Sequence, residues 1–180
     1  MRIHQNNSVI VVVDMQERLF PHIHEHRTLE HNCKILLSGF QVLKIPLLLT
    51  EQYPKGLGNT IQSIQSVLTI YEPIEKMTFS CCAEKKFTRR LTDLGRHNVI
   101  LCGIESHVCV LQTTLDLSEM GYQPVVVVDC VSSRKPEDKE IALKRMQQEN
   151  VLLTSYESIL FELCSVAGTD VFKVISGLVK

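Results

Sequence analysis

Three side chains that could do nucleophilic chemistry follow predicted strands: Asp14, Lys76 and Cys109. A cysteine can attack a carbonyl carbon, a carboxylate can take the thiol proton, and a lysine can favour the thiolate by its charge. If Ser106 caps the helix that follows, Cys109 lies in the first turn, where the helix dipole also favours a thiolate. These residue types indicate acyl transfer through a cysteine.

Each of the three residues also has an ordinary structural interpretation. An aspartate after a strand is most often a turn residue or a helix cap. A lysine is usually a solvated surface charge. Cys109 is flanked by Val108 and Val110, which suits a buried apolar thiol. Spacing alone therefore leaves a catalytic and a structural role open.

The remaining cysteines fit no disulfide or zinc pattern. The chain has seven cysteines, an odd number, and two of them, Cys81 and Cys82, are adjacent. It has no CxxC pair of the kind that zinc sites and redox motifs use. We expect most of these side chains to be buried free thiols.

The elements that position the three residues alternate between strand and helix. Ser8 to Val13 is a continuous β-branched apolar run, typical of a strand buried on both faces. Similar runs occur at 46–50, 98–103, 124–129 and 151–154, with a weaker candidate between 67 and 75. Helical patterns occupy 29–43, 83–94, 106–120 and 136–149. The alternation predicts a three-layer α-β-α fold of the α/β class, with a doubly wound, mainly parallel sheet of about six strands.

In such a fold, ligands bind beyond the carboxyl ends of the strands, where the strand order reverses. We therefore expect Asp14, Lys76 and Cys109 to meet at this edge of the sheet. Position alone suggests four further side chains as walls of a substrate pocket: Phe20, Gln52, Tyr53 and Phe79. The strand order cannot be derived from these patterns.

Length and composition favour one domain, residues 1–180. Nineteen basic and twenty acidic residues give a net charge of −1, which provides no reason to expect a nucleic acid or membrane partner. No signal peptide and no membrane-spanning run is recognisable, so we expect a cytoplasmic protein. Neither GxGxxG nor GxxxxGK[ST] occurs, which argues against a nucleotide-binding domain.

Three segments resemble the signature segments of the isochorismatase-like hydrolase superfamily, which includes nicotinamidases, N-carbamoylsarcosine amidohydrolases and isochorismatases. They are Val13–Gln16, Lys76–Ser80 and Gly103–Val110, in the order of the superfamily. Thr50–Gly58 and Ser132–Arg134 look closest to the isochorismatase domain-containing branch. The resemblance spans nearly the whole chain and implies the Rossmann-like fold of that superfamily.

The resemblance implies a role for each residue of the site. Cys109 matches the nucleophile, Asp14 the general base, and Lys76 the cation that holds the aspartate. It also implies a non-proline cis peptide bond between Ile104 and Glu105. The backbone amides of Glu105 and Cys109 would then stabilise the oxyanion.

The activity implied is hydrolysis of a small amide or ureido C–N bond through a thioester on Cys109. True isochorismatases cleave a vinyl ether without a thiol, so the cysteine favours amide chemistry. The metal site of nicotinamidases, an Asp-x-His motif after the second strand, is missing because Thr50–Tyr53 contains no histidine. We therefore expect no metal and no cofactor. Relatives are commonly homo-oligomers, and we expect the same here.

Two histidine patterns have simpler interpretations than catalysis. The alternating histidines at 22, 24 and 26 could bind zinc or nickel, but a polar loop that opens the first helix is favoured. His107 lies two residues before Cys109, and residues two apart on a helical turn do not face each other.

The alternative to an enzyme is a catalytically silent isochorismatase-like module for assembly or interaction.

Overall fold

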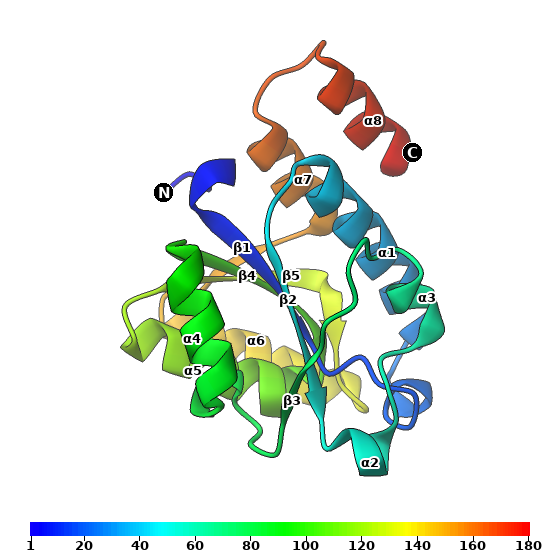
Figure 1. The fold of residues 1–180 in the computed structure, drawn as a ribbon, viewed down its shortest axis with the longest axis vertical. Coiled ribbons are helices and arrows are strands. Elements are labelled where there is room, and N and C mark those ends of the chain that lie inside the picture. The colour runs from blue at the N-terminus through cyan, green and yellow to red at the C-terminus, as the bar shows by residue number, and fades with distance from the viewer.

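The computed structural model describes residues 1–180 and is built around one parallel sheet (Figure 1). Its six strands are β1 (Ser8–Val13), β2 (Leu47–Gln52), β3 (Ile74–Lys76), β4 (Asn98–Ile104), β5 (Gln123–Ser132) and β6 (Leu152–Thr154). Their order across the sheet is β3-β2-β1-β4-β5-β6, and every pair is parallel. The predicted α/β class and the number of strands are confirmed.

The strand order reverses between β1 and β4. The chain moves outward from β1 to β3 on one side, then returns to place β4 against the other side of β1. Val13, the last residue of β1, pairs with Thr50 of β2 and with Gly103 of β4. The carboxyl ends of these strands therefore meet at the switch point, where ligands bind in doubly wound sheets.

Helices cover both faces of the sheet and make it the middle of three layers (Figure 1). One face carries α1 (His26–Val42), α3 (Gln62–Gln65), α7 (Tyr156–Cys164) and α8 (Asp170–Leu178). The other carries α4 (Lys85–Leu94), α5 (Leu111–Glu119) and α6 (Pro136–Gln148), while the short α2 (Pro54–Leu57) follows β2. None of these helices combines the length and apolar character needed to span a membrane.

Side-chain alternation along β1 divides the core into two clusters. Ile10 and Val12 pack with Phe40 of α1, whereas Val11 and Val13 pack on the opposite face with Phe87 of α4. All are buried, because a central parallel strand is covered on both faces. Burial of each such side chain contributes about 1.5–3 kcal/mol.

The helix predicted at 106–120 begins differently from the sequence expectation. Ser106–Val110 forms a π-helical turn, η4, and the α-helix starts only at Leu111. The Ser106 side chain does not cap the helix, since its hydroxyl is buried without a hydrogen-bond partner. Cys109 thus lies in η4 rather than in an α-helical first turn.

Candidate active site

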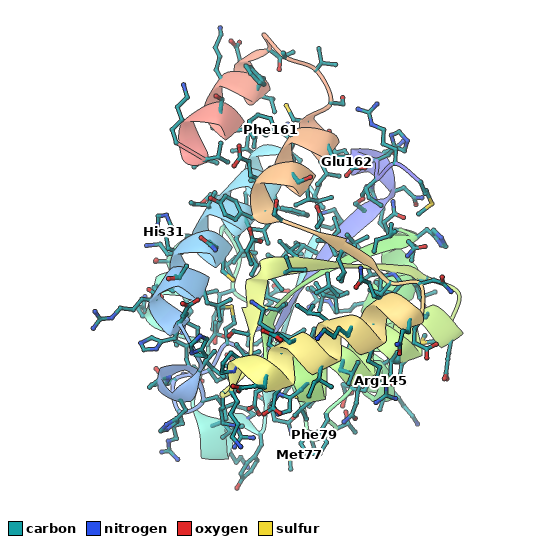
Figure 2. The ribbon with its side chains drawn as sticks, turned by 180° about the vertical axis from the view of Figure 1, so that it is seen from behind. His31, Met77, Phe79, Arg145, Phe161 and Glu162 are labelled. Carbon is teal, nitrogen blue, oxygen red and sulfur yellow. The ribbon has the colours of Figure 1, made fainter.

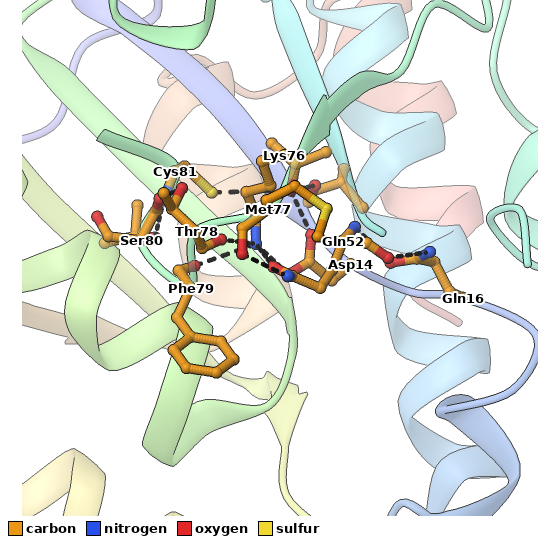
Figure 3. Close-up of polar contacts among 12 residues, drawn as sticks. Asp14, Gln16, Gln52, Lys76, Met77, Thr78, Phe79, Ser80 and Cys81 are labelled. Carbon is orange, nitrogen blue, oxygen red and sulfur yellow. Dashed lines mark hydrogen bonds and ion pairs between the residues drawn. The ribbon is translucent and has the colours of Figure 1, made fainter. Parts of the chain in front are cut away.

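Asp14 follows β1 directly and is completely buried (Figure 3). Its Oδ1 accepts a hydrogen bond from the Thr50 hydroxyl at 2.8 Å, and its Oδ2 accepts one from Lys76 Nζ at 2.6 Å. Thr50 lies beside the end of β1 because Val13 pairs with Thr50. The carboxylate is therefore fixed by groups from two neighbouring strands.

Lys76 ends β3 and is almost fully buried. Besides Asp14, its ammonium group donates to Gln52 Oε1 at 2.8 Å and to the carbonyl oxygens of Thr78 at 3.2 Å and Phe79 at 3.0 Å. Burial is the largest single effect and lowers the pKa of Lys76, but the negative charge of Asp14, the neighbouring thiols and the hydrogen bond to Asp14 together raise it by more, so the net pKa is raised. Lys76 is therefore a permanent cation at neutral pH.

Cys109 lies in η4 and is 6% exposed. Burial first, and then the negative charge of Asp14, raise the pKa of its thiol, while Lys76 lowers it. Lys76 favours the thiolate, as expected, but burial and the charge of Asp14 together outweigh it, so the net shift of the Cys109 pKa is upward and the resting thiol is protonated. The physical reason is that a thiolate would be a second buried anion beside Asp14. The thiol needs a base at the moment of attack.

The peptide bond between Ile104 and Glu105 is cis, as the resemblance implied. The carbonyl oxygen of Glu105 accepts hydrogen bonds from Val108 N at 3.1 Å and Val110 N at 3.2 Å, but its N–H donates none within the chain. Its carboxylate pairs with Arg134 Nε at 2.6 Å. The Glu105 N–H is therefore available to an external acceptor.

Gln16 joins the ends of β1 and β2. Its amide nitrogen donates to the carbonyl oxygens of Gln52 at 2.9 Å and Gly58 at 2.7 Å, and its amide oxygen accepts from Gln52 N at 2.7 Å. Gln52 in turn contacts Lys76 through its side chain. Gln16 and Thr50 were not predicted as site residues, although both lie in the quoted family segments.

Cys81 is a second buried thiol near Asp14, which the sequence analysis treated as an ordinary core cysteine. Its Sγ lies 3.7 Å from the Thr50 hydroxyl. Burial first, and then the charge of Asp14, raise its pKa to about 11. Only its place shortly after Lys76 in the chain could have indicated this proximity.

The suggested pocket walls separate into two groups. Gln52 contacts Lys76, and Tyr53 and Phe79 are 47% and 55% exposed at the carboxyl edge of the sheet. Met77, which was not predicted, is 70% exposed and extends from the same edge as Phe79 (Figure 2). Phe20 is 4% exposed in the core, with its ring against His26, so little of it is left to contact a ligand.

His107 contacts groups other than Cys109. Its Nδ1 lies 2.9 Å from the Ser133 hydroxyl, and its Nε2 lies 3.9 Å from the Asp138 carboxylate. These contacts join η4 to the end of β5 and the first turn of α6. His26 begins α1, three residues before the helix start predicted at 29, and no three histidine, cysteine, aspartate or glutamate side chains are grouped to hold a metal ion.

The fold and the site define an α/β protein of the hydrolase kind, with its reactive groups at the switch point. The family model of the isochorismatase domain matches residues 8–158, and the chain belongs to the isochorismatase family. It is 37% identical to the secreted isochorismatase effector Isc1 of Phytophthora sojae, over 99% of this chain and 87% of that protein. It is also 37% identical to isochorismatase domain-containing protein 2 of Danio rerio, over 98% and 89%.

Solved structures agree with this assignment. The MAR1 ribonuclease of Caenorhabditis elegans has a TM-score of 0.93 and 39% identity, over 99% of this chain and 92% of that one. The YcaC protein of Escherichia coli, an octameric hydrolase of unknown specificity, has a TM-score of 0.93 at 20% identity, over 99% and 89%. The second likeness shows the fold alone. The resemblance inferred from the sequence segments is confirmed.

Proposed function

We propose that the protein is a metal-independent cysteine hydrolase that cleaves a small amide or ureido C–N bond. The observation that carries this proposal is the buried Lys76–Asp14 ion pair, 2.6 Å long, whose two charges both act on the Cys109 thiol. A base, a fixed cation and a nucleophile together are the parts that nucleophilic catalysis needs.

In the proposed reaction, Asp14 takes the thiol proton as Cys109 Sγ attacks the carbonyl carbon. A C–S bond forms and the carbonyl electron pair moves to oxygen, where the amides of Glu105 and Cys109 stabilise the charge. Each such donor contributes about 3 kcal/mol. The C–N bond then breaks, Asp14 returns the proton to the leaving nitrogen, and water hydrolyses the thioester.

The charges at the site favour a neutral substrate. Lys76 is paired with Asp14, and Arg134 is paired with Glu105. Arginine and lysine side chains commonly bind phosphate, and the two cations named above are already paired, which argues against the ribonuclease activity named for the Caenorhabditis elegans protein. An uncharged amide or urea can bind without a free cation, so the paired Lys76 and Arg134 are compatible with such a substrate.

The test uses p-nitrophenyl acetate, an activated acyl donor, because it needs no knowledge of the natural substrate. We expect acetylation of Cys109 to be the major modification, located by peptide mass spectrometry, with nitrophenol released as a burst. Cys109→Ala should abolish both signals, and Asp14→Asn should slow acylation by about 10²-fold or more, the usual range for a lost general base. Cys164→Ala is the matched control, because Cys164 is a free cysteine at the end of α7.

Acetylation spread evenly over the cysteines, or a burst that survives Cys109→Ala, would contradict the thioester mechanism. A folded protein without any burst would favour the alternative, a catalytically silent module for interaction or assembly.

All seven cysteines are free, which suits the reducing cytoplasm that we propose as the location of the protein.

A further inference from the structure

A groove of about 590 Å³ lies at the amino end of β2, at the other end of the strands from Cys109. It is bounded by the end of α1, the start of β2, the segment 68–72 and the end of α4, and we call it the amino-edge groove. Its volume is within the range typical of small-molecule sites, about 300–1,000 Å³. The proposed reaction makes no use of it.

The floor of the amino-edge groove is apolar because the sheet is incomplete there. β3 pairs with β2 only from Thr50 onward, so Leu47 to Leu49 lie on an open sheet edge. Leu47 and Leu68 are half-buried in the floor, and Ile70 at the rim is 67% exposed. An apolar group lying here would remove this surface from water, which is favourable.

The rim of the amino-edge groove carries cations without acidic partners. The Lys44 ammonium group forms no hydrogen bond or ion pair within the chain, and Lys44 is exposed. The Arg96 guanidinium is held in position by the carbonyl oxygens of Gln5, at 3.3 Å, and Asn6. Arg90 is different, because it pairs with Glu72 at 2.8 Å.

Lys44 and Arg96 also line a second cavity of about 550 Å³, next to the first. The acidic side chain of that cavity, Glu162, accepts a hydrogen bond from Ile3 N at 2.6 Å. Glu162 lies at the far end of the molecule from Met77 and Phe79 (Figure 2). Two unpaired cations are therefore concentrated where an apolar floor begins, away from the candidate active site.

We propose that the amino-edge groove binds an amphipathic organic anion. The carboxylate would lie between Lys44 and Arg96, and the apolar body would lie along Leu47 and Leu68. A small anion would leave the apolar floor in water, and a neutral apolar molecule would leave both cations unpaired. The unpaired cations and the apolar floor together favour a ligand that has both a carboxylate and an apolar body.

The test is an NMR titration of the ¹⁵N-labelled full chain with octanoate, with 1-octanol and acetate as matched probes. We expect octanoate to shift the amide signals of Leu47, Leu68 and Lys44 in a saturable manner. Acetate and octanol should each bind at least about fivefold more weakly, because each lacks one of the two required parts. Equal binding of octanol or of acetate would overturn the proposal.

Two variants make the test specific to the groove. Lys44→Gln should weaken octanoate binding by about threefold to fivefold, the usual effect of one exposed charge, and leave octanol unchanged. Lys144→Gln, which removes an exposed lysine from α6, is the matched control and should change neither. Octanoate binding that is insensitive to Lys44→Gln, or shifts centred on Tyr53, Met77 and Phe79, would overturn the proposal. Thermal unfolding of each variant checks that the fold is intact.

Discussion

Lys76 and Asp14 form an ion pair that is buried on both sides, with side-chain exposures of 0% and 1%. Such pairs add little net stability, because desolvation of both charges offsets their attraction, but removal of one partner leaves an unpaired buried charge. The Thr50 hydroxyl also donates to Asp14, and Lys76 also donates to Gln52 and to the carbonyl oxygens of Thr78 and Phe79, so both charged groups are hydrogen-bonded in the core. We therefore expect the ion pair to hold the Asp14 carboxylate in position rather than to stabilise the fold.

This view predicts a non-additive double-mutant cycle. Lys76→Met should lower the free energy of unfolding by about 3–5 kcal/mol, since it strands Asp14 in the core. The double variant Lys76→Met/Asp14→Asn should recover most of that loss, while acylation of Cys109 stays low. Urea denaturation of the single and double variants measures the free energies of unfolding that the cycle compares. Additive losses would show that the two side chains do not depend on each other.

The raised pKa of Cys81 predicts a pH dependence of stability. Its thiol titrates near 9 when unfolded and at about 11 in the folded protein, so the folded state holds the proton more tightly. The stabilisation is complete below pH 9 and is lost as the pH rises toward 11, by about 3 kcal/mol. Urea midpoints measured between pH 8 and 11 should fall less steeply for Cys81→Ala. An unchanged slope would contradict the assignment.

At the scale of elements, the close approach of β1 and β4 depends on Gly103. It has a φ of +122°, and a Cβ atom there would lie 2.1 Å from the carbonyl oxygen of Val13, the residue before Asp14. No side chain fits this space without moving one of the two strands. The contact therefore links the geometry of β4 to the placement of the proposed base.

Gly103→Ala is accordingly expected to lower both stability and acylation of Cys109. The matched control is Gly177→Ala in α8, where an added Cβ meets nothing within 4 Å. Since alanine favours helix over glycine, the control should raise the free energy of unfolding by about 0.5–1 kcal/mol. Thermal unfolding measures the change in stability, and the nitrophenol burst from p-nitrophenyl acetate measures the change in acylation of Cys109. A stable, active Gly103→Ala protein would mean that β1 and β4 can separate freely.

For the whole molecule, three of the exposed apolar side chains lie beside the candidate active site. Tyr53, Met77 and Phe79 lie at the carboxyl edge of the sheet and are more exposed than large apolar residues usually are. Apolar patches of this kind often mark interaction surfaces. We propose that the homo-oligomer expected from the sequence forms on this surface.

Sedimentation equilibrium tests the oligomer. We expect a mass that is a multiple of 20.5 kDa for the native chain and a lower mass for Met77→Ser/Phe79→Ser. Ile141→Ser is the control, because Ile141 is also exposed but lies on α6. A monomeric native protein would contradict the oligomer, and an unchanged mass in the double variant would place its interface elsewhere.

Local sequence patterns determined much of this protein. The β-branched run of Ser8–Val13 predicted a strand buried on both faces, because the two-residue period of a strand is a local property. The positions of Asp14, Lys76 and Cys109 after predicted strands, together with the resemblance of the segments around them to a known family, predicted the reactive groups. Short or weakly patterned elements were harder to predict: β3 has only three residues, and α7 and α8 were not predicted.

Only the tertiary structure decided how those groups act on one another. It placed β3 beside β2, so that Lys76 reaches Asp14, and it placed Thr50 and Cys81 next to the carboxylate. It also reversed the expected shift of the Cys109 pKa, because burial and a neighbouring charge are set by residues distant in sequence. The residue types present could be read along the chain, whereas the distances and electric fields between them depend on strand order and packing.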